Sequence, residues 1–199
     1  MMNMSGNLPQ KNSSEQSLSR STALALEMFL LMMAGAFAMF LHYRLRIPLN
    51  IPGHHGLEFM AIFVLIRLGS NVRYAASIAS LGVGIFLLLP GMGASNPLHS
   101  FGYLLPGLVL DSLYMLGSKR FQMFLLIIFL AGFAYMSIPL SRLFVTLITG
   151  YPIPAFIKFG TAYTILSFFF FGMLGGLLGY GMNSIKTSFR KSDDEQKTT

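Results

Sequence analysis

The densest group of residues that could do chemistry is a short segment containing His54, His55 and Glu58. Imidazole and carboxylate groups bind transition metals, and they also hydrogen-bond to polar substrates. Two adjacent histidines point in different directions and rarely chelate one metal alone. A metal site here would therefore need Glu58, His99 or His42 as well. The segment predicts a substrate-binding or metal-binding cap, with a solvated interfacial loop as the alternative.

Asp111 is the most informative single residue, because apolar sequence surrounds it on both sides. Its predicted helix places it about 12–15 Å from either end, and a carboxylate at that depth in a membrane needs a partner or a task. We expect Asp111 to point inward beside Tyr114, three residues on, and to line the floor of an outward-opening cavity capped by His54 and His55. The alternative is a structural carboxylate that hydrogen-bonds to a neighbouring helix.

Arg142 is the third candidate for ligand binding. It follows Pro139 near the end of an apolar stretch, where helical rise places it close to the predicted outer boundary of the membrane. A guanidinium at that position could hold a carboxylate or a phosphate through two hydrogen bonds. It could equally extend toward lipid headgroups. The predicted substrate-binding set is therefore His54, His55, Glu58, Asp111, Tyr114 and Arg142.

The segments that carry these residues are apolar blocks of membrane length. Hydrophobic residues make up 54% of the 199 residues and charged residues 11%, against about 25% charged residues in soluble domains. Mean hydropathy is +0.63. The pattern predicts an all-α integral membrane protein, with one compact six-transmembrane-helix bundle over residues 22–185. The predicted spans are 22–43, 57–68, 74–89, 101–117, 121–138 (with a possible continuation past Pro139) and 161–182.

Residues 1–21 and 186–199 are polar and predict disordered cytoplasmic tails. With the N-terminus inside, ten of the fourteen Lys and Arg residues lie on the inner side and four on the outer side. Because basic residues collect on the cytoplasmic side of membrane proteins, both termini are predicted to be cytoplasmic. The long loops, rich in Pro and Gly, then all lie on the outer side, where we expect the binding site.

Several function classes are disfavoured by what the sequence lacks. It has no cysteine, which excludes disulfides and thiolate nucleophiles. It contains no serine-hydrolase, zinc-protease or nucleotide-binding motif, and no basic stripe for nucleic acid. We therefore expect no enzymatic activity, no resident metal or cofactor and no nucleic-acid partner. Without a nucleotide site, the chain cannot energise transport by itself.

Small residues mark a face where helices come close. Ala34 and Ala38 lie four residues apart in the first predicted span and therefore share one side of that helix. Such a pair allows close packing against another helix of the same chain. It could also form a docking surface for a second membrane protein, and the motif alone does not decide between the two.

The organisation resembles the substrate-binding S component of energy-coupling-factor vitamin transporters. The likeness covers residues 22–185 and rests on six predicted helices, a long first outer loop (IPLNIPGHHGLE) and the AxxxA pair Ala34 and Ala38. It implies that this pair contacts a transmembrane coupling protein with ATPase subunits. It also implies that the first outer loop caps a pocket lined by the later helices. The expected function is capture of a small nutrient such as a vitamin, in a bacterial inner or plasma membrane.

Two other function classes remain open from the sequence. One is an intramembrane metal-dependent enzyme, such as a hydrolase, that would use His54, His55, Glu58 and Asp111. The other is a structural or assembly membrane protein. Co-purification with a coupling protein and ATPases would favour substrate capture, whereas zinc loading and an activity lost with Glu58 would favour the enzyme.

Overall fold

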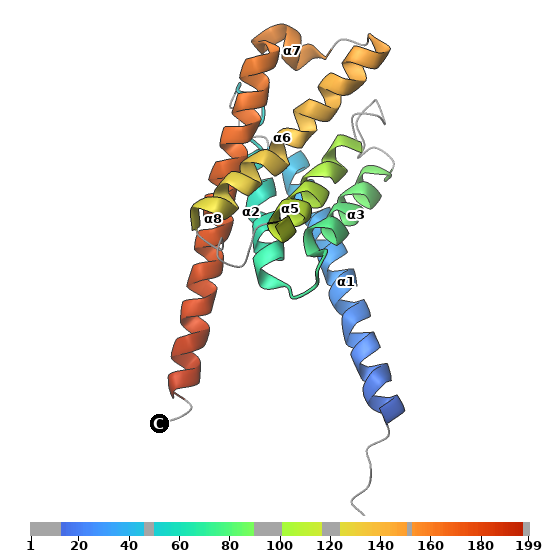
Figure 1. The fold of residues 1–199 in the computed structure, drawn as a ribbon, viewed down its shortest axis with the longest axis vertical. Coiled ribbons are helices and arrows are strands. Elements are labelled where there is room, and N and C mark those ends of the chain that lie inside the picture. Colours follow the sequence, from blue (N-terminus) through green and yellow to red (C-terminus); the bar gives the residue numbers. More distant parts are fainter. Residues whose placement is uncertain (1–12, 46–49, 90–100, 117–123, 151–152, 197–199) are drawn as a thin grey trace, which may run out of the picture.

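The computed structural model describes residues 13–45, 50–89, 101–116, 124–150 and 153–196, and every regular element in those ranges is a helix (Figure 1). In chain order the elements are α1 (Ser13–Arg44), α2 (Gly56–Gly69), α3 (Ala75–Leu87), the 3-10 turn η1 (Gly102–Leu104), α5 (Leu105–Leu116), α6 (Phe124–Thr149), α7 (Pro154–Phe159) and α8 (Thr161–Gln196).

Within the described ranges, three helical segments are long and apolar enough to cross a membrane: Ser19–Arg44, Phe124–Thr149 and Thr161–Phe189. Two shorter apolar helical segments are Ala75–Leu87 and Gly102–Leu116. These lengths and compositions are compatible with a membrane protein. The count of six spans and the cytoplasmic placement of the termini stay predictions.

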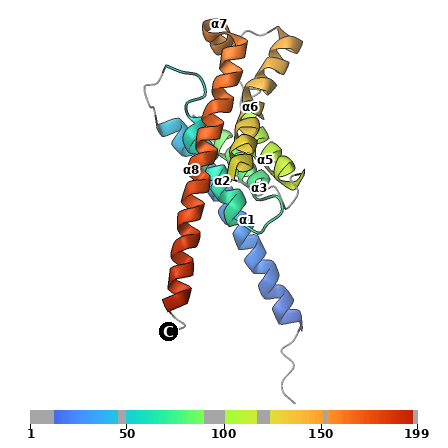
Figure 2. The ribbon, with the colours of Figure 1, turned by 60° about the vertical axis from the view of Figure 1, so that its left-hand side comes forward.

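The two ends of the chain differ from the sequence-based prediction. Residues 13–21 and 186–196, predicted to be disordered, continue α1 and α8 as helix, while residues 1–12 and 197–199 lie outside the described part. The reason is that extending an existing helix is far easier than nucleating one. Figures 1 and 2 show the start of α1 and the end of α8 projecting on the same side of the molecule, away from α7.

Between α6 and α8 the structure contains a short helix, α7, that the sequence did not predict. α6 runs through the buried Pro139 and ends at Thr149. The short α7 then begins with Pro154 at its first position, where a proline loses no helical hydrogen bond. Gly160, at φ +84°, ends α7 and leads directly into α8. This turn brings residues 153–164 over the end of the bundle that holds the candidate site.

The core is centred on α2, which packs against α1, α3 and α8. Its residues Phe59, Met60, Phe63 and Val64 are fully buried. On α8, glycines form two close-packing faces: Gly175 and Gly179 lie against backbone carbonyls of α2, and Gly172 and Gly176 lie against Ala131 of α6. Any side chain larger than hydrogen at these positions would push the helices apart.

The small residues of α1 pack in the same way, within the chain. A side chain at Gly35 would overlap the carbonyl of Ala79 on α3, and one at Gly82 would overlap the carbonyl of Met32. Ala38 is fully buried and Ala34 is half-buried against the core. The structure therefore leaves no surface at Ala38 for the predicted partner contact, because α3 already lies close to this face of α1.

Candidate functional site

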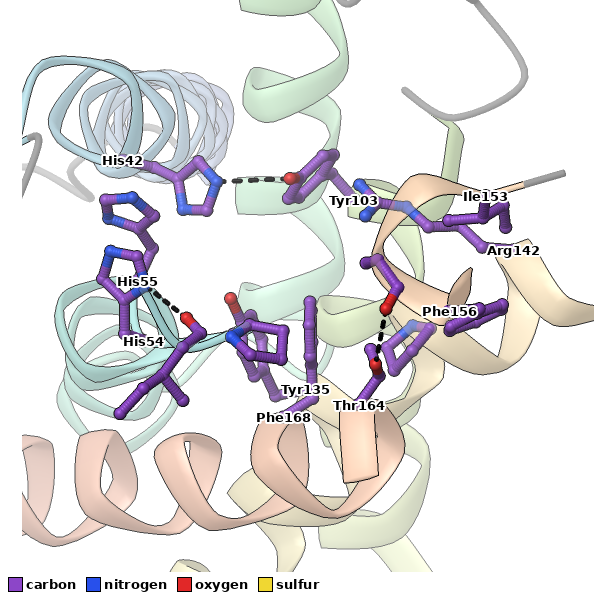
Figure 3. A pocket seen from close by; sticks show the side chains of 15 residues that line it. His42, His54, His55, Tyr103, Tyr135, Arg142, Ile153, Phe156, Thr164 and Phe168 are labelled. Atoms are coloured by element: carbon purple, nitrogen blue, oxygen red, sulfur yellow. Dashed lines mark hydrogen bonds between the residues drawn. The ribbon is translucent and has the colours of Figure 1, made fainter. Parts of the chain in front are cut away.

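A cavity of about 210 Å³ lies at the end of the bundle where α1 ends and α2 begins. Its walls come from the end of α1, residues 51–55, the η1 turn, α6, α7 and the first turns of α8. Figure 3 shows His42, His54 and His55 together on one side of it, and Arg142, Ile153 and Phe156 on the other.

Residues 51–55 form a fixed cap over the cavity. Gly53 has φ +82°, a conformation that favours glycine, and it lies against the ring of Phe168. Ser167 donates a hydrogen bond of 2.5 Å to the carbonyl of Pro52. His54 Nδ1 lies 2.6 Å from the carbonyl oxygen of Ile51. Because a carbonyl only accepts, Nδ1 carries the hydrogen, and Nε2 of the neutral ring keeps its lone pair.

The histidine side of the cavity combines residues from two helices. The rings of His42 and His55 lie 4.8 Å apart, and those of His54 and His55 lie 4.0 Å apart. His55 Nδ1 hydrogen-bonds to Glu58 Oε1 at 2.9 Å, across one turn of α2. His42 Nε2 hydrogen-bonds to the hydroxyl of Tyr103 at 3.2 Å. These contacts hold both rings in defined orientations.

The opposite side of the cavity presents a guanidinium. Arg142 lies over the ring of Tyr103, with its Cζ 5.3 Å from the ring centroid. Among the described residues, no carboxylate forms an ion pair with Arg142. The floor between the two sides is aromatic, because Tyr135 and Phe168 stack with centroids 4.9 Å apart.

The cavity gathers polar atoms that have no partner. In the described part of the chain, six buried side-chain nitrogen or oxygen atoms lack a hydrogen bond. Four of them belong to this region: His42 Nδ1, His54 Nε2, Glu58 Oε2 and Arg142 Nε. Buried polar atoms are almost always satisfied, so a cluster of unsatisfied ones indicates a place where a ligand or an ion completes the bonding.

The structure brings together some of the predicted site residues and separates others. His54, His55 and Arg142 line the cavity, and Glu58 is bonded to His55 beside it. Asp111 and Tyr114 do not line it, which corrects the expectation that Asp111 forms its floor. The predicted cluster of His54, His55, Glu58 and Asp111 is therefore not assembled.

Asp111 instead lies toward the far end of α2. Its Oδ1 is 3.2 Å from Nη1 of Arg67, and its Oδ2 accepts hydrogen bonds of 2.7 Å from both the backbone N–H and the hydroxyl of Ser77. The same guanidinium lies over the ring of Tyr114, with Arg67 Cζ 4.7 Å from the ring centroid. The expectation failed because Arg67, in the last turn of α2, is a nearby partner that a single helix pattern does not reveal.

Residues that the sequence did not mark as ligand-binding complete the cavity: Tyr103, Tyr135, Thr164 and Phe168. Aromatic residues are frequent throughout this chain, so nothing in the local sequence distinguished these from the rest of the core. The sequence predicts His42 only as a further metal ligand, and its place in the wall depends on how α1 packs.

Comparison with protein-family models, with curated proteins and with solved structures finds no match to this chain. The geometry and chemistry of the site are therefore what indicate the function.

Proposed function

We propose that this protein is a multi-pass membrane protein that captures a small anionic nutrient in the cavity beneath residues 51–55. In this proposal it is the substrate-binding subunit of an uptake system. The observation that carries the proposal is the cavity, in which Arg142 Nε and two histidine nitrogens have no partner among the described residues and the floor is aromatic.

The chemistry of the walls supports a ligand with one anionic end and one apolar part. The Arg142 fork suits a carboxylate or phosphate, and His54 Nε2 suits a hydroxyl or amide hydrogen. The stacked rings of Tyr135 and Phe168 suit an apolar or aromatic portion. An apolar cavity of about 150 Å³ holds a benzene molecule. A volume of about 210 Å³ therefore suits a ligand of roughly eight non-hydrogen atoms.

The proposed topology places the cavity on the outer side of a bacterial inner or plasma membrane. Ten of the fourteen basic residues then lie inside, and the cavity-capping loop lies outside. The start of α1 and the end of α8 project on one side, which supports two cytoplasmic termini. The sequence has no nucleotide-binding motif, so uptake would depend on a transmembrane coupling protein with ATPase subunits.

Native mass spectrometry of the protein purified in detergent tests the proposal directly. We expect one small molecule per chain, released on activation. Arg142→Ala should weaken its binding by about 10- to 100-fold, because a hydrogen bond to a charged group contributes about 1.5–3 kcal/mol. Arg44→Ala is the matched control, since Arg44 is exposed at the end of α1. Equal ligand occupancy in both variants would contradict the proposal.

A further inference from the structure

One wall of the cavity carries a set of ligand atoms that the capture of an organic anion does not require. His42, His55 and Glu58 each offer one potential metal-binding atom, and these three atoms lie within 4.8 Å of one another. His42 comes from the last turn of α1, while His55 and Glu58 come from the start of α2. We propose that these three side chains bind a divalent transition metal of the zinc class.

The donor types and their spacing fit such an ion. Two imidazoles and one carboxylate are a known three-ligand set for zinc, with a fourth position left open. Bonds of about 2.0–2.2 Å in a tetrahedral arrangement place the ligand atoms roughly 3.3 Å apart. The separation of His55 Nδ1 and Glu58 Oε1 is 2.9 Å, and none in the set exceeds 4.8 Å.

The unsatisfied atoms of the cavity support the same site. His42 Nδ1 and Glu58 Oε2 are buried and have no hydrogen-bond partner. The other nitrogen of His42 is bonded to the hydroxyl of Tyr103 at 3.2 Å. A histidine that binds a metal usually has its second nitrogen fixed in this way. Tyr103 is therefore a positioning residue, which leaves Nδ1 of His42 free for the metal.

His54 stands apart from this metal triad of His42, His55 and Glu58. It is not among the three residues whose ligand atoms converge, and its unpaired Nε2 stays available to the bound anion. The open fourth position of the metal would be filled by water or by an oxygen of the bound anion. The inference thus deepens the proposed function, since it uses the same cavity and adds a positive charge where the anion would lie.

Metal binding is measured on the protein itself, with any polyhistidine tag removed because a tag binds the same ions. The full chain in detergent is titrated with Co²⁺, and its zinc content is measured by inductively coupled plasma mass spectrometry. We expect one ion per chain and the intense visible absorption of four-coordinate Co²⁺. His55→Ala and Glu58→Gln should each weaken binding by at least the roughly 10- to 100-fold that loss of an outer-shell partner causes.

Glu27→Gln is the matched control for Glu58→Gln, because Glu27 accepts a hydrogen bond from Ser70 far along α2 from the metal triad. It should bind Co²⁺ as the parent does. Size-exclusion profiles establish that each variant is folded, and Glu58→Gln keeps the shape of the side chain in case His55→Ala does not fold. Binding by the parent no tighter than by folded Glu58→Gln would overturn the inference. This readout needs no organic ligand, so a failure of the proposed capture function would be seen separately.

Discussion

The guanidinium of Arg67 and the carboxylate of Asp111 form an ion pair with a separation of 3.2 Å, in which Asp111 is 1% exposed. Arg67 also donates to the carbonyls of Val72 and Arg73, so it ties the turn after α2 to α5. The pair lies about 18 Å along α2 from His55, as twelve residues of helical rise require. Its location argues for a role in holding the bundle together.

Replacing Asp111 should therefore lower stability before it alters ligand binding. Asp111→Leu leaves Arg67 buried without a counter-charge, which costs about 3–5 kcal/mol. Asp111→Asn should cost less, because the amide oxygen can still accept from Ser77. Thermal unfolding in detergent measures both. The double replacement Arg67→Met with Asp111→Leu should recover part of the loss, and a single variant that unfolds like the parent would contradict the assigned role.

Gly53 should be sensitive to any added side chain. Gly53→Ala combines a strained backbone at φ +82° with a clash, since the new Cβ would lie 2.6 Å from an atom of the Phe168 ring. Gly160→Ala is a close control, because its φ is +84° and nothing lies within 4 Å of its Cβ position. We expect about 1–2 kcal/mol of destabilisation for the control and more for Gly53→Ala.

The same pair of glycine variants separates stability from cap function. Gly53→Ala should also lower ligand occupancy in native mass spectrometry, because the displaced cap carries His54 and His55. Gly160→Ala should leave occupancy close to that of the parent. If both variants lose the same stability and keep the same occupancy, the packing of the cap on Phe168 does not matter for binding.

Ala38→Leu should destabilise the chain itself. Ala38 is fully buried at the contact of α1 with the core, and three extra carbon atoms in a packed interior cost about 1–3 kcal/mol. Ala25→Leu in the same helix is the control, since Ala25 is exposed and should tolerate the change. The measurement is the fraction of monodisperse protein after heating. If Ala38→Leu is as stable as the parent but no longer co-purifies with a membrane partner, the docking role expected from the sequence would be supported instead.

The topology can be tested by single cysteines, because the chain has none of its own. Asn50→Cys lies beside the cavity and Ser188→Cys near the end of α8, and both positions are exposed. An impermeant thiol reagent applied to intact cells should label Asn50→Cys and not Ser188→Cys. Both should react after the membrane is permeabilised. The reverse pattern would invert the proposed topology, and labelling of both in intact cells would exclude it.

Much of the helical organisation could be predicted from the sequence because it depends on local composition. Apolar blocks predict the ends of α2 and α3 to within two residues, those of α5 to within four, and the start of α8 at Thr161. The extension of α1 and α8 into polar sequence was missed, since polar composition alone does not distinguish a disordered tail from the continuation of a helix. α7 was not predicted, because a helix of six residues is too short to show the helical repeat of apolar residues.

The sequence by itself determined that a histidine pair, a glutamate and an arginine lie at the ends of apolar helices. Only the tertiary structure decided their partners. His42 reaches His55 because α1 packs beside α2. Asp111 pairs with Arg67 across 44 residues of sequence because α3 packs against both α2 and α5. Periodicity fixes which face of a helix a residue occupies, whereas the neighbour on that face depends on how several helices pack at once.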